Sequence, residues 1–156
     1  MQGRVTDLDR AYAAGFFDGE GSVTISYPVA FRNSQKGWQV GCSVSQLDPA
    51  PLRWLQERWG GSVNGPRRNG QYDWRIHSAQ VDRFLADIGP FLIVKGEAAA
   101  ILVEFRQKVF HHVGSRGLPE DEIARRRRLH QELQAANRRG RRWETAESAE
   151  ATSEEG

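Results

Sequence analysis

The sequence predicts a single α+β domain in which helices cover one face of an antiparallel sheet. Segments with helical periodicity and segments of alternating apolar and polar residues follow one another in the order helix, two strands, helix, two strands, helix. Polar or glycine-containing turns separate the paired alternating segments, as in β-hairpins. A chain of 156 residues can bury one core and is short for two domains of usual size.

The first helix is expected to begin after Thr6 and to end near Asp18. Thr6 can cap its N-terminus, and Asp9, three residues later, completes a capping box. Gly19 and Gly21 interrupt the helical pattern, and a strand follows in which every second residue is apolar. These apolar residues are Val23, Ile25, Tyr27, Val29 and Phe31.

The alternation resumes after a polar turn at residues 32–37 and predicts a second strand over residues 38–45. Asp48-Pro49 opens a second helix, which is expected to stop at Gly60-Gly61. A second hairpin is predicted over residues 62–77, because a polar turn interrupts a further alternating pattern there.

Two helices are expected after the second hairpin, and the second of them is entered through the apolar run Phe91–Val94 and reaches about Val109. A Gly-rich linker then leads to a final helix that ends near Asn137. It begins with three acids at residues 120–122, which complement the helix dipole. Residues 143–156 contain too few apolar side chains to fold and are expected to be disordered.

The net charge of +2 conceals an asymmetry along the chain. Residues 144–156 hold five glutamates and no Lys or Arg, so residues 1–143 carry 22 basic against 15 acidic residues, a net charge of +7. A basic body favours a polyanionic partner. Arginine outnumbers lysine nineteen to three, which suits bidentate contact with phosphates and guanine edges but is equally consistent with a coding bias.

Several functional classes are disfavoured. The sequence has neither an apolar run of eighteen residues nor a secretory signal pattern, so we expect a cytoplasmic, nucleoid-associated or organellar protein with no membrane partner. Cys42 is the only cysteine, which leaves no internal disulfide and no cysteine-based zinc cluster within one chain. The glycine-rich stretches match neither a P-loop nor a calcium loop, and no small-molecule substrate is expected.

The second face of the predicted sheet is rich in short hydrogen-bonding side chains. It carries Thr24, Ser26, Gln39, Ser43, Asp73, Arg75 and His77, and Arg32, Lys36, Arg67 and Arg68 lie at its turns. A solvated antiparallel face is common without any function, so this pattern alone leaves the role of the face open.

The stretch AAGFFDGEG, residues 13–21, places two acids where a helix is expected to end. Gly15 and Gly19 are four residues apart and share one helix face, which lets another helix approach closely. Asp18 and Glu20 are unfavourable at this end, because the C-terminus of a helix already carries partial negative charge. A positive group is therefore expected beside them.

In order and spacing, AAGFFDGEG resembles the motif of the LAGLIDADG homing endonuclease family, with Glu20 at the position of the catalytic acid. The predicted elements resemble that family's αββαββα fold, with its saddle-shaped antiparallel sheet, over about residues 5–110. The resemblance implies an endonuclease domain at residues 1–112. Beyond the resemblance, composition predicts a Gly-rich linker and a basic C-terminal helix at residues 113–142 and the disordered acidic tail at residues 143–156.

Two further segments resemble those of the single-motif members. The second strand ends in Gln46, where these enzymes place a glutamine near the scissile phosphate, and the apolar run ends in Lys95, where they place an active-site lysine. Lys95 is also unusual on physical grounds, because the dipole disfavours a cation at a helix start. Members often carry a basic residue shortly after the glutamine; here a Pro-rich turn intervenes, and Arg53 is the candidate.

The resemblance implies a homodimer, because the chain holds a single motif. The motif helices of two chains would pack together through Tyr12, Gly15, Phe16 and Gly19. This would bring both Glu20 carboxylates beneath the minor groove of double-stranded DNA, where Glu20 and the Gly19 carbonyl would hold Mg²⁺, with Mn²⁺ or Ca²⁺ as substitutes in binding. The polar sheet face and its turns would read the bases and contact the phosphates of a near-palindromic target.

Two functional classes therefore compete. A metal-dependent, site-specific double-strand DNA endonuclease is favoured, because Glu20, Gln46 and Lys95 are all present as candidate catalytic residues. The alternative is a protein that keeps the fold without cutting, either an intron RNA splicing cofactor (maturase) or a DNA-binding regulator. The Arg-rich final helix with Arg125–Arg128 is compatible with RNA binding or with a solvated helix face.

Overall fold

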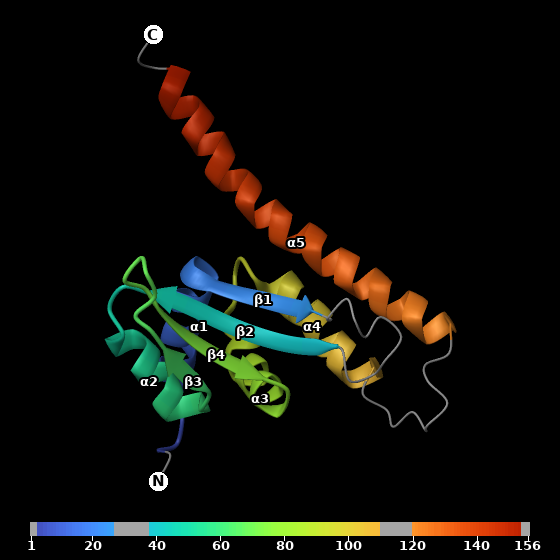
Figure 1. Ribbon diagram of the computed structural model, residues 1–156, viewed down its shortest axis with the longest axis horizontal. Helices are drawn as coiled ribbons and strands as arrows, with labels where there is room; N and C mark the ends of the chain where they lie inside the picture. The colour runs from blue at the N-terminus through green and yellow to red at the C-terminus, as the bar shows by residue number, and fades with distance from the viewer. Residues whose placement is uncertain (1–2, 27–37, 110–119, 154–156) are drawn as a thin grey trace.

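The computed structural model describes residues 3–26, 38–109 and 120–153 (Figure 1). The elements are α1 (Asp7–Glu20), β1 (Gly21–Ser26), β2 (Gln39–Gln46), α2 (Ala50–Trp59), β3 (Ser62–Asn64), β4 (Tyr72–His77), α3 (Ala79–Ile88), the 3-10 turn η3 (Gly89–Phe91), α4 (Gly96–Val109) and α5 (Glu120–Ser153). The first seven elements confirm the predicted αββαββα order.

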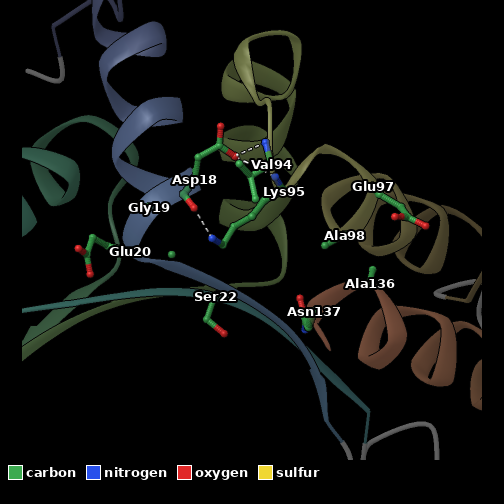
Figure 2. Close-up of a pocket in the computed structure, with 11 residues that line it drawn as sticks. Asp18, Gly19, Glu20, Ser22, Val94, Lys95, Glu97, Ala98, Ala136 and Asn137 are labelled. Carbon is green, nitrogen blue, oxygen red and sulfur yellow. Dashed lines mark hydrogen bonds between the residues drawn. The ribbon is translucent and has the colours of Figure 1, made fainter. Parts of the chain in front are cut away.

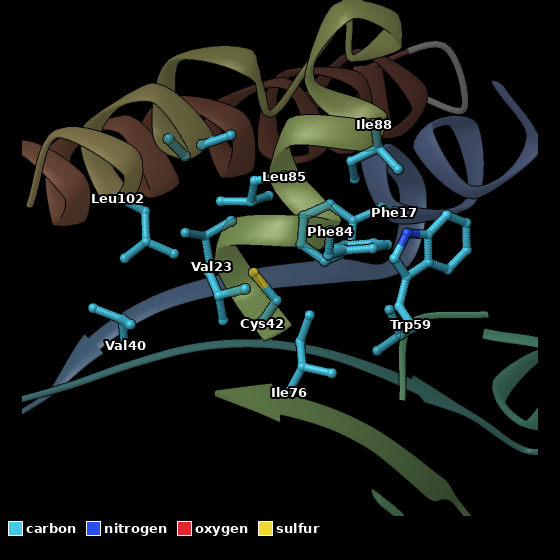
Figure 3. Close-up of a cluster of buried hydrophobic side chains, with 14 of the residues drawn as sticks. Phe17, Val23, Val40, Cys42, Trp59, Ile76, Phe84, Leu85, Ile88 and Leu102 are labelled. Atoms are coloured by element: carbon cyan, nitrogen blue, oxygen red, sulfur yellow. The ribbon is translucent and has the colours of Figure 1, made fainter. Parts of the chain in front are cut away.

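The four strands form one antiparallel sheet in the order β1-β2-β4-β3. The pairing places Cys42 of β2 between Val23 of β1 and Ile76 of β4, so these three side chains point to the same face. Figure 3 shows the helices on this side of the sheet, with the hydrophobic core between the two layers. Burial in this core raises the pKa of the Cys42 thiol well above its ordinary value.

Phe84 of α3 lies at the centre of an aromatic cluster that joins the helices to the sheet. Its ring packs edge to face against Phe17 of α1, Trp59 of α2 and Trp74 of β4, with ring centroids 5.3, 5.2 and 5.1 Å away. All four residues are buried. Aromatic pairs of this geometry contribute about 0.5–1.5 kcal/mol each beyond the area they bury, so this cluster fixes α1 against the sheet.

The predicted capping box at the start of α1 is confirmed. The Thr6 hydroxyl accepts the Asp9 N–H at 3.2 Å, and the Asp9 carboxylate accepts the Thr6 N–H at 2.9 Å, which lowers the pKa of Asp9. The helix ends at Glu20, slightly later than predicted. β1 follows directly, and a Cβ at Gly21 would lie 2.2 Å from the ring of Phe17, so only glycine fits at this junction.

The final helix, α5, differs from its prediction. Leu129 and Leu133 are buried in the same core as the sheet, and Asn137 donates a hydrogen bond from Nδ2 to the carbonyl oxygen of Val23 at 3.2 Å. The helix continues to Ser153, which corrects both the predicted helix end near Asn137 and the disordered tail as far as that residue. Alanine, glutamate and arginine are strong helix formers, and extending an existing helix avoids the cost of nucleation.

Several predicted features lie outside the described residues. They are the end of the first strand at residues 27–31, the turn at residues 32–37 with Arg32 and Lys36, the linker at residues 113–118, and residues 154–156. Among the described helices, none is both long and apolar enough to cross a membrane.

Candidate active site

A pocket of ≈ 340 Å³ lies where the C-terminal end of α1 meets the N-terminal end of α4 (Figure 2). β1 runs along its base, and α5 borders one side. The pocket brings together the predicted residues Gly19, Glu20 and Lys95 from segments that are far apart in the sequence. Its lining also includes Asp18, Ser22, Glu97 and Asn137.

The carboxylate of Asp18 anchors the segment that leads into α4. Its Oδ2 atom accepts a hydrogen bond from the Ile93 N–H at 2.8 Å, and its Oδ1 atom accepts those of Val94 and Lys95 at 3.1 and 2.9 Å. Successive backbone N–H groups that converge in this way form a concavity suited to an anion. The hydrogen bonds from the backbone before α4 therefore offset the unfavourable interaction of the Asp18 carboxylate with the negative end of the α1 dipole.

Lys95 supplies the positive group that the sequence predicts beside the two acids. Its ammonium donates a hydrogen bond to the carbonyl oxygen of Asp18 at 2.5 Å (Figure 2). The last carbonyls of a helix lack helical partners and carry partial negative charge, so a cation is favourable at this place. Its Nζ thus lies against the last turn of α1, the turn that ends at Glu20.

Glu20 is the last residue of α1, and its side chain is exposed. Figure 2 shows its carboxylate extending from the helix end away from α4. Gly19, which precedes it, is exposed as well. The motif acid is therefore accessible to a ligand.

Gln46 and Arg53 do not line this pocket. Gln46 is the half-buried last residue of β2 and pairs with Tyr72, and Arg53 is exposed on α2. Their catalytic roles remain predictions. Asn137 lines the pocket although no sequence signal marks it, because only the packing of α5 along β1 brings it there.

One face of α1 is open in the single chain. At Gly15 and Gly19 an added Cβ would meet no atom within 4 Å, and Tyr12 is 53 % exposed. Phe16 is half-buried. A shallow groove of ≈ 560 Å³ continues this face towards α2 and is lined by Leu8, Asp9, Tyr12, Asp48, Ala50, Pro51 and Trp54. The residues predicted for the dimer interface thus border a surface with room for a second helix.

The outer face of the sheet carries most of the predicted polar side chains in accessible positions. Thr24, Ser26, Gln39, Arg75 and His77 are exposed, Ser43 is half-buried, and Arg68 is exposed between β3 and β4. The pairing aligns Ser22 and Ser43 with Arg75 in one row across the strands, and it places Thr24 and His77 on either side of Gly41 in the next row.

Asp73 departs from the accessible position predicted for it. Its side chain is only 5 % exposed and forms an ion pair with Arg67, while Arg75 lies 3.9 Å away. The hydroxyl of Ser45 donates a hydrogen bond to the same carboxylate at 2.5 Å. Asp73 is on the outer face by its position in β4, but the arginine from the neighbouring turn covers it. The two residues partner each other in the single chain.

Solved structures of homing endonucleases share this architecture. I-CvuI in complex with its target matches with a TM-score of 0.66 and 18 % identity over 83 % of this chain and 82 % of that chain. The archaeal intron-encoded I-Vdi141I, complexed with DNA, matches with a TM-score of 0.70 and 22 % identity over 83 % of this chain and 84 % of that chain. The LAGLIDADG homing endonuclease I-GzeII matches with a TM-score of 0.53 and 17 % identity over 64 % of this chain and 35 % of that chain.

These similarities establish that the chain has the LAGLIDADG homing endonuclease fold, as the motif predicted. No family model matches the sequence, and no curated protein matches it.

Proposed function

We propose that the protein is a homodimeric, site-specific endonuclease that hydrolyses both strands of a DNA duplex with a divalent metal ion. The observation that carries this proposal is the arrangement at the end of α1, where an exposed Glu20 and the Lys95 ammonium lie in one pocket. A carboxylate for a cation and an ammonium for a phosphate are the two charges that phosphodiester hydrolysis requires close together.

The open face of α1 supports a homodimer. One chain offers one Glu20, whereas cutting two strands requires an acid near each scissile phosphate. Gly15 and Gly19 leave space for close approach of a second α1, and the exposed ring of Tyr12 would be buried by it. Twofold symmetry then places the two acids side by side at the centre of the assembly.

The outer face of the sheet supports DNA as the substrate. It is antiparallel and bears short polar side chains together with Arg75 and His77, and a two-stranded ribbon of this kind fits the major groove. The basic charge of residues 1–143 favours the phosphate backbone. Two copies of the sheet would follow the major grooves on either side of a minor groove that spans the active sites, so the target is near-palindromic.

The residues at the end of α1 fit a Mg²⁺ ion. Glu20 offers a carboxylate oxygen and Gly19 a carbonyl oxygen, and Mg²⁺ prefers oxygen ligands. Within the described part of the chain, no group of three or more His, Cys, Asp or Glu side chains is arranged so that it could hold a metal ion. Mg²⁺ is suited to such a sparse site, because it keeps several waters and shares substrate phosphates.

The side chains divide the work of hydrolysis among them. A divalent ion held by Glu20 and the Gly19 carbonyl would neutralise charge on the scissile phosphate and would make a water more acidic. Lys95 donates a hydrogen bond to a phosphate oxygen whose negative charge grows as the water oxygen attacks phosphorus. Gln46, which lies outside this pocket at the end of β2, is predicted to orient the attacking water through its amide. That water releases a proton to the solvent as its oxygen bonds to phosphorus, and the leaving 3′ oxygen takes a proton from a solvent water as its bond to phosphorus breaks.

The proposal is tested by incubating the protein with a randomised duplex library in Mg²⁺ and sequencing the cut products. We expect both strands to be cut at one near-palindromic sequence, and EDTA to abolish cutting. Retention of specific duplexes without any cut, in Mg²⁺ or Mn²⁺, would contradict the endonuclease and favour the regulator. Retention of structured intron RNA alone would favour the splicing cofactor.

The ion pair of Asp73 leads to a separate prediction about specificity. In Asp73→Asn the neutral amide no longer pairs with Arg67, which becomes free to contact a phosphate. We therefore expect several-fold tighter binding to unrelated duplex DNA. The binding constant should also depend more steeply on salt concentration, by about one phosphate contact. The stability cost is about 1 kcal/mol, because Arg67 is half-exposed and can be solvated. Fluorescence anisotropy over a salt series measures the change.

Asp82→Asn is the matched control for this experiment. Asp82 pairs with Arg106 at 2.6 Å on the helical side of the protein, away from the sheet face. The Asp82→Asn variant should lose a similar ion pair, and the salt dependence of its DNA binding should equal that of wild type. If both variants steepen it equally, net charge rather than Asp73 is responsible.

A further inference from the structure

We propose that Asp18 is a positioning residue that holds Lys95 in the place required for catalysis. This inference rests on the proposed function, because the position of Lys95 matters for the reaction only if the chain cuts a phosphodiester. It concerns a residue of the motif that neither binds the metal nor contacts the substrate in the mechanism above.

The first step is that Asp18 bonds to three consecutive residues before α4. Its two carboxylate oxygens accept the backbone N–H groups of Ile93, Val94 and Lys95 at 2.8, 3.1 and 2.9 Å. Hydrogen bonds to an ionised acceptor are about twice as strong as neutral ones. The segment is therefore tied to α1 by one side chain.

The second step is that apolar burial does little to hold residues 93 and 94 themselves, whereas the flanking Leu92 and Ala98 pack against or within the core. Ile93 is 90 % exposed and Val94 is 62 % exposed, so neither side chain packs into the core. A backbone without buried side chains takes its position from its hydrogen bonds. Between these packed flanks, the hydrogen bonds to Asp18 hold the backbone that leads to Lys95.

The third step is that the charged residue at the end of each helix, α1 or α4, contacts the end of the other helix. The acid belongs to the C-terminal end of α1 and binds the backbone before α4, whereas the lysine precedes α4 and its ammonium binds the Asp18 carbonyl of α1 at 2.5 Å. Each charge is unfavourable on its own helix and favourable at the end of the other. Figure 2 shows the closed loop of contacts that results.

The consequence is a fixed relation between the two catalytic charges. Asp18 lies two residues before Glu20, so one turn of α1 carries the metal-binding acid and the anchor for Lys95. A shift of a catalytic group by about 1 Å can cost on the order of 100-fold in rate. Releasing this anchor should therefore slow the chemical step while leaving the DNA-binding face of the sheet unchanged.

The test compares Asp18→Ala and Asp18→Asn with wild type on the duplex that wild type selects from the randomised library. We expect Asp18→Ala to lower the single-turnover cleavage rate on the order of 100-fold and to change the Kd for the duplex less than about threefold. The cleavage rate of Asp18→Asn should lie between those of wild type and Asp18→Ala, because the amide oxygen of asparagine can still accept hydrogen bonds from the Val94 and Lys95 N–H groups.

Thr6→Ala is the matched control, because Thr6 caps the opposite end of the same helix. It should destabilise α1 and leave the cleavage rate at the wild-type value. If Thr6→Ala slows cleavage as much as Asp18→Ala, the effect of Asp18 is general helix stability and the proposal is overturned. Should Asp18→Ala fail to fold, Asp18→Asn carries the comparison.

A second readout does not depend on cleavage. The chain has three lysines, so the ammonium signals of a ¹⁵N-lysine-labelled protein can be assigned with Lys95→Arg. We expect the Lys95 ammonium protons to exchange slowly in wild type and to exchange like exposed lysines in Asp18→Ala. An unchanged exchange rate, or an unchanged cleavage rate, overturns the proposal. If the wild-type protein cuts no duplex, the proposed endonuclease function is refuted instead. The exchange rates of the Lys95 ammonium protons then still decide whether Asp18 holds Lys95.

Discussion

Replacing Glu20 by glutamine is expected to abolish cleavage and to preserve binding of the target duplex. Glutamine keeps the size of the side chain and removes the negative charge that is proposed to hold a cation at the end of α1. Charge stabilisation at a reacting phosphate supplies a large share of the rate, so we expect a loss on the order of 1000-fold. Affinity for the duplex should stay equal or rise, because a carboxylate near phosphates is removed. Gel electrophoresis and anisotropy measure the two quantities.

Glu57→Gln is the control for this variant. Glu57 is an exposed acid on α2 whose side chain is 75 % accessible, and its loss changes the net charge by the same amount. It should cut DNA at the wild-type rate. Full activity of Glu20→Gln would remove the motif acid from the reaction and with it the metal site proposed here.

Replacing Gly15 by leucine is expected to separate the proposed dimer while leaving the folded chain intact. In the single chain an added Cβ at Gly15 meets no atom within 4 Å, and leucine raises helix propensity over glycine by about 0.5–1 kcal/mol. The same side chain would collide with a second α1 packed on the glycine face. We therefore expect a native circular dichroism spectrum, a monomer by light scattering, and no double-strand cleavage.

Ala86→Leu is the matched control for added bulk on a helix. Ala86 is exposed on α3, away from the open face of α1. This variant should remain a dimer and cut DNA normally. A Gly15→Leu protein that still forms a stable dimer would show that the subunits associate through another surface.

The order of the elements could be predicted because it depends on local patterns. The alternation in residues 21–26 and 38–46 reports which face of a strand is buried, and helical spacing does the same for α1. The capping box at Thr6 was equally readable, since both partners lie within one turn. The end of α5 could not be predicted in this way. Its low apolar content indicated a disordered tail, but strong helix formers can extend a helix whose earlier turns pack against the core.

The candidate site was only partly predictable. The motif pointed to Glu20, and the lysine at an unfavourable helix start pointed to Lys95. Nothing in the sequence indicated that Asn137 borders the same pocket, because its place depends on how α5 lies along β1. Asp73 was expected in an accessible position, because alternation identifies the face of a strand but not the arginine that covers it.

A local reading of the chain was enough for the helix and strand order, the single acidic motif and hence one candidate metal-binding acid in each chain. Only the tertiary structure showed what the first acid of the motif contacts, because Asp18 binds the backbone before α4 while Glu20 stays exposed. The reason is physical: periodicity and capping act over a few residues, whereas the partners of Asp18 lie at least 75 positions away. Contacts between residues so far apart in the sequence form only when α1 and α4 pack on the sheet.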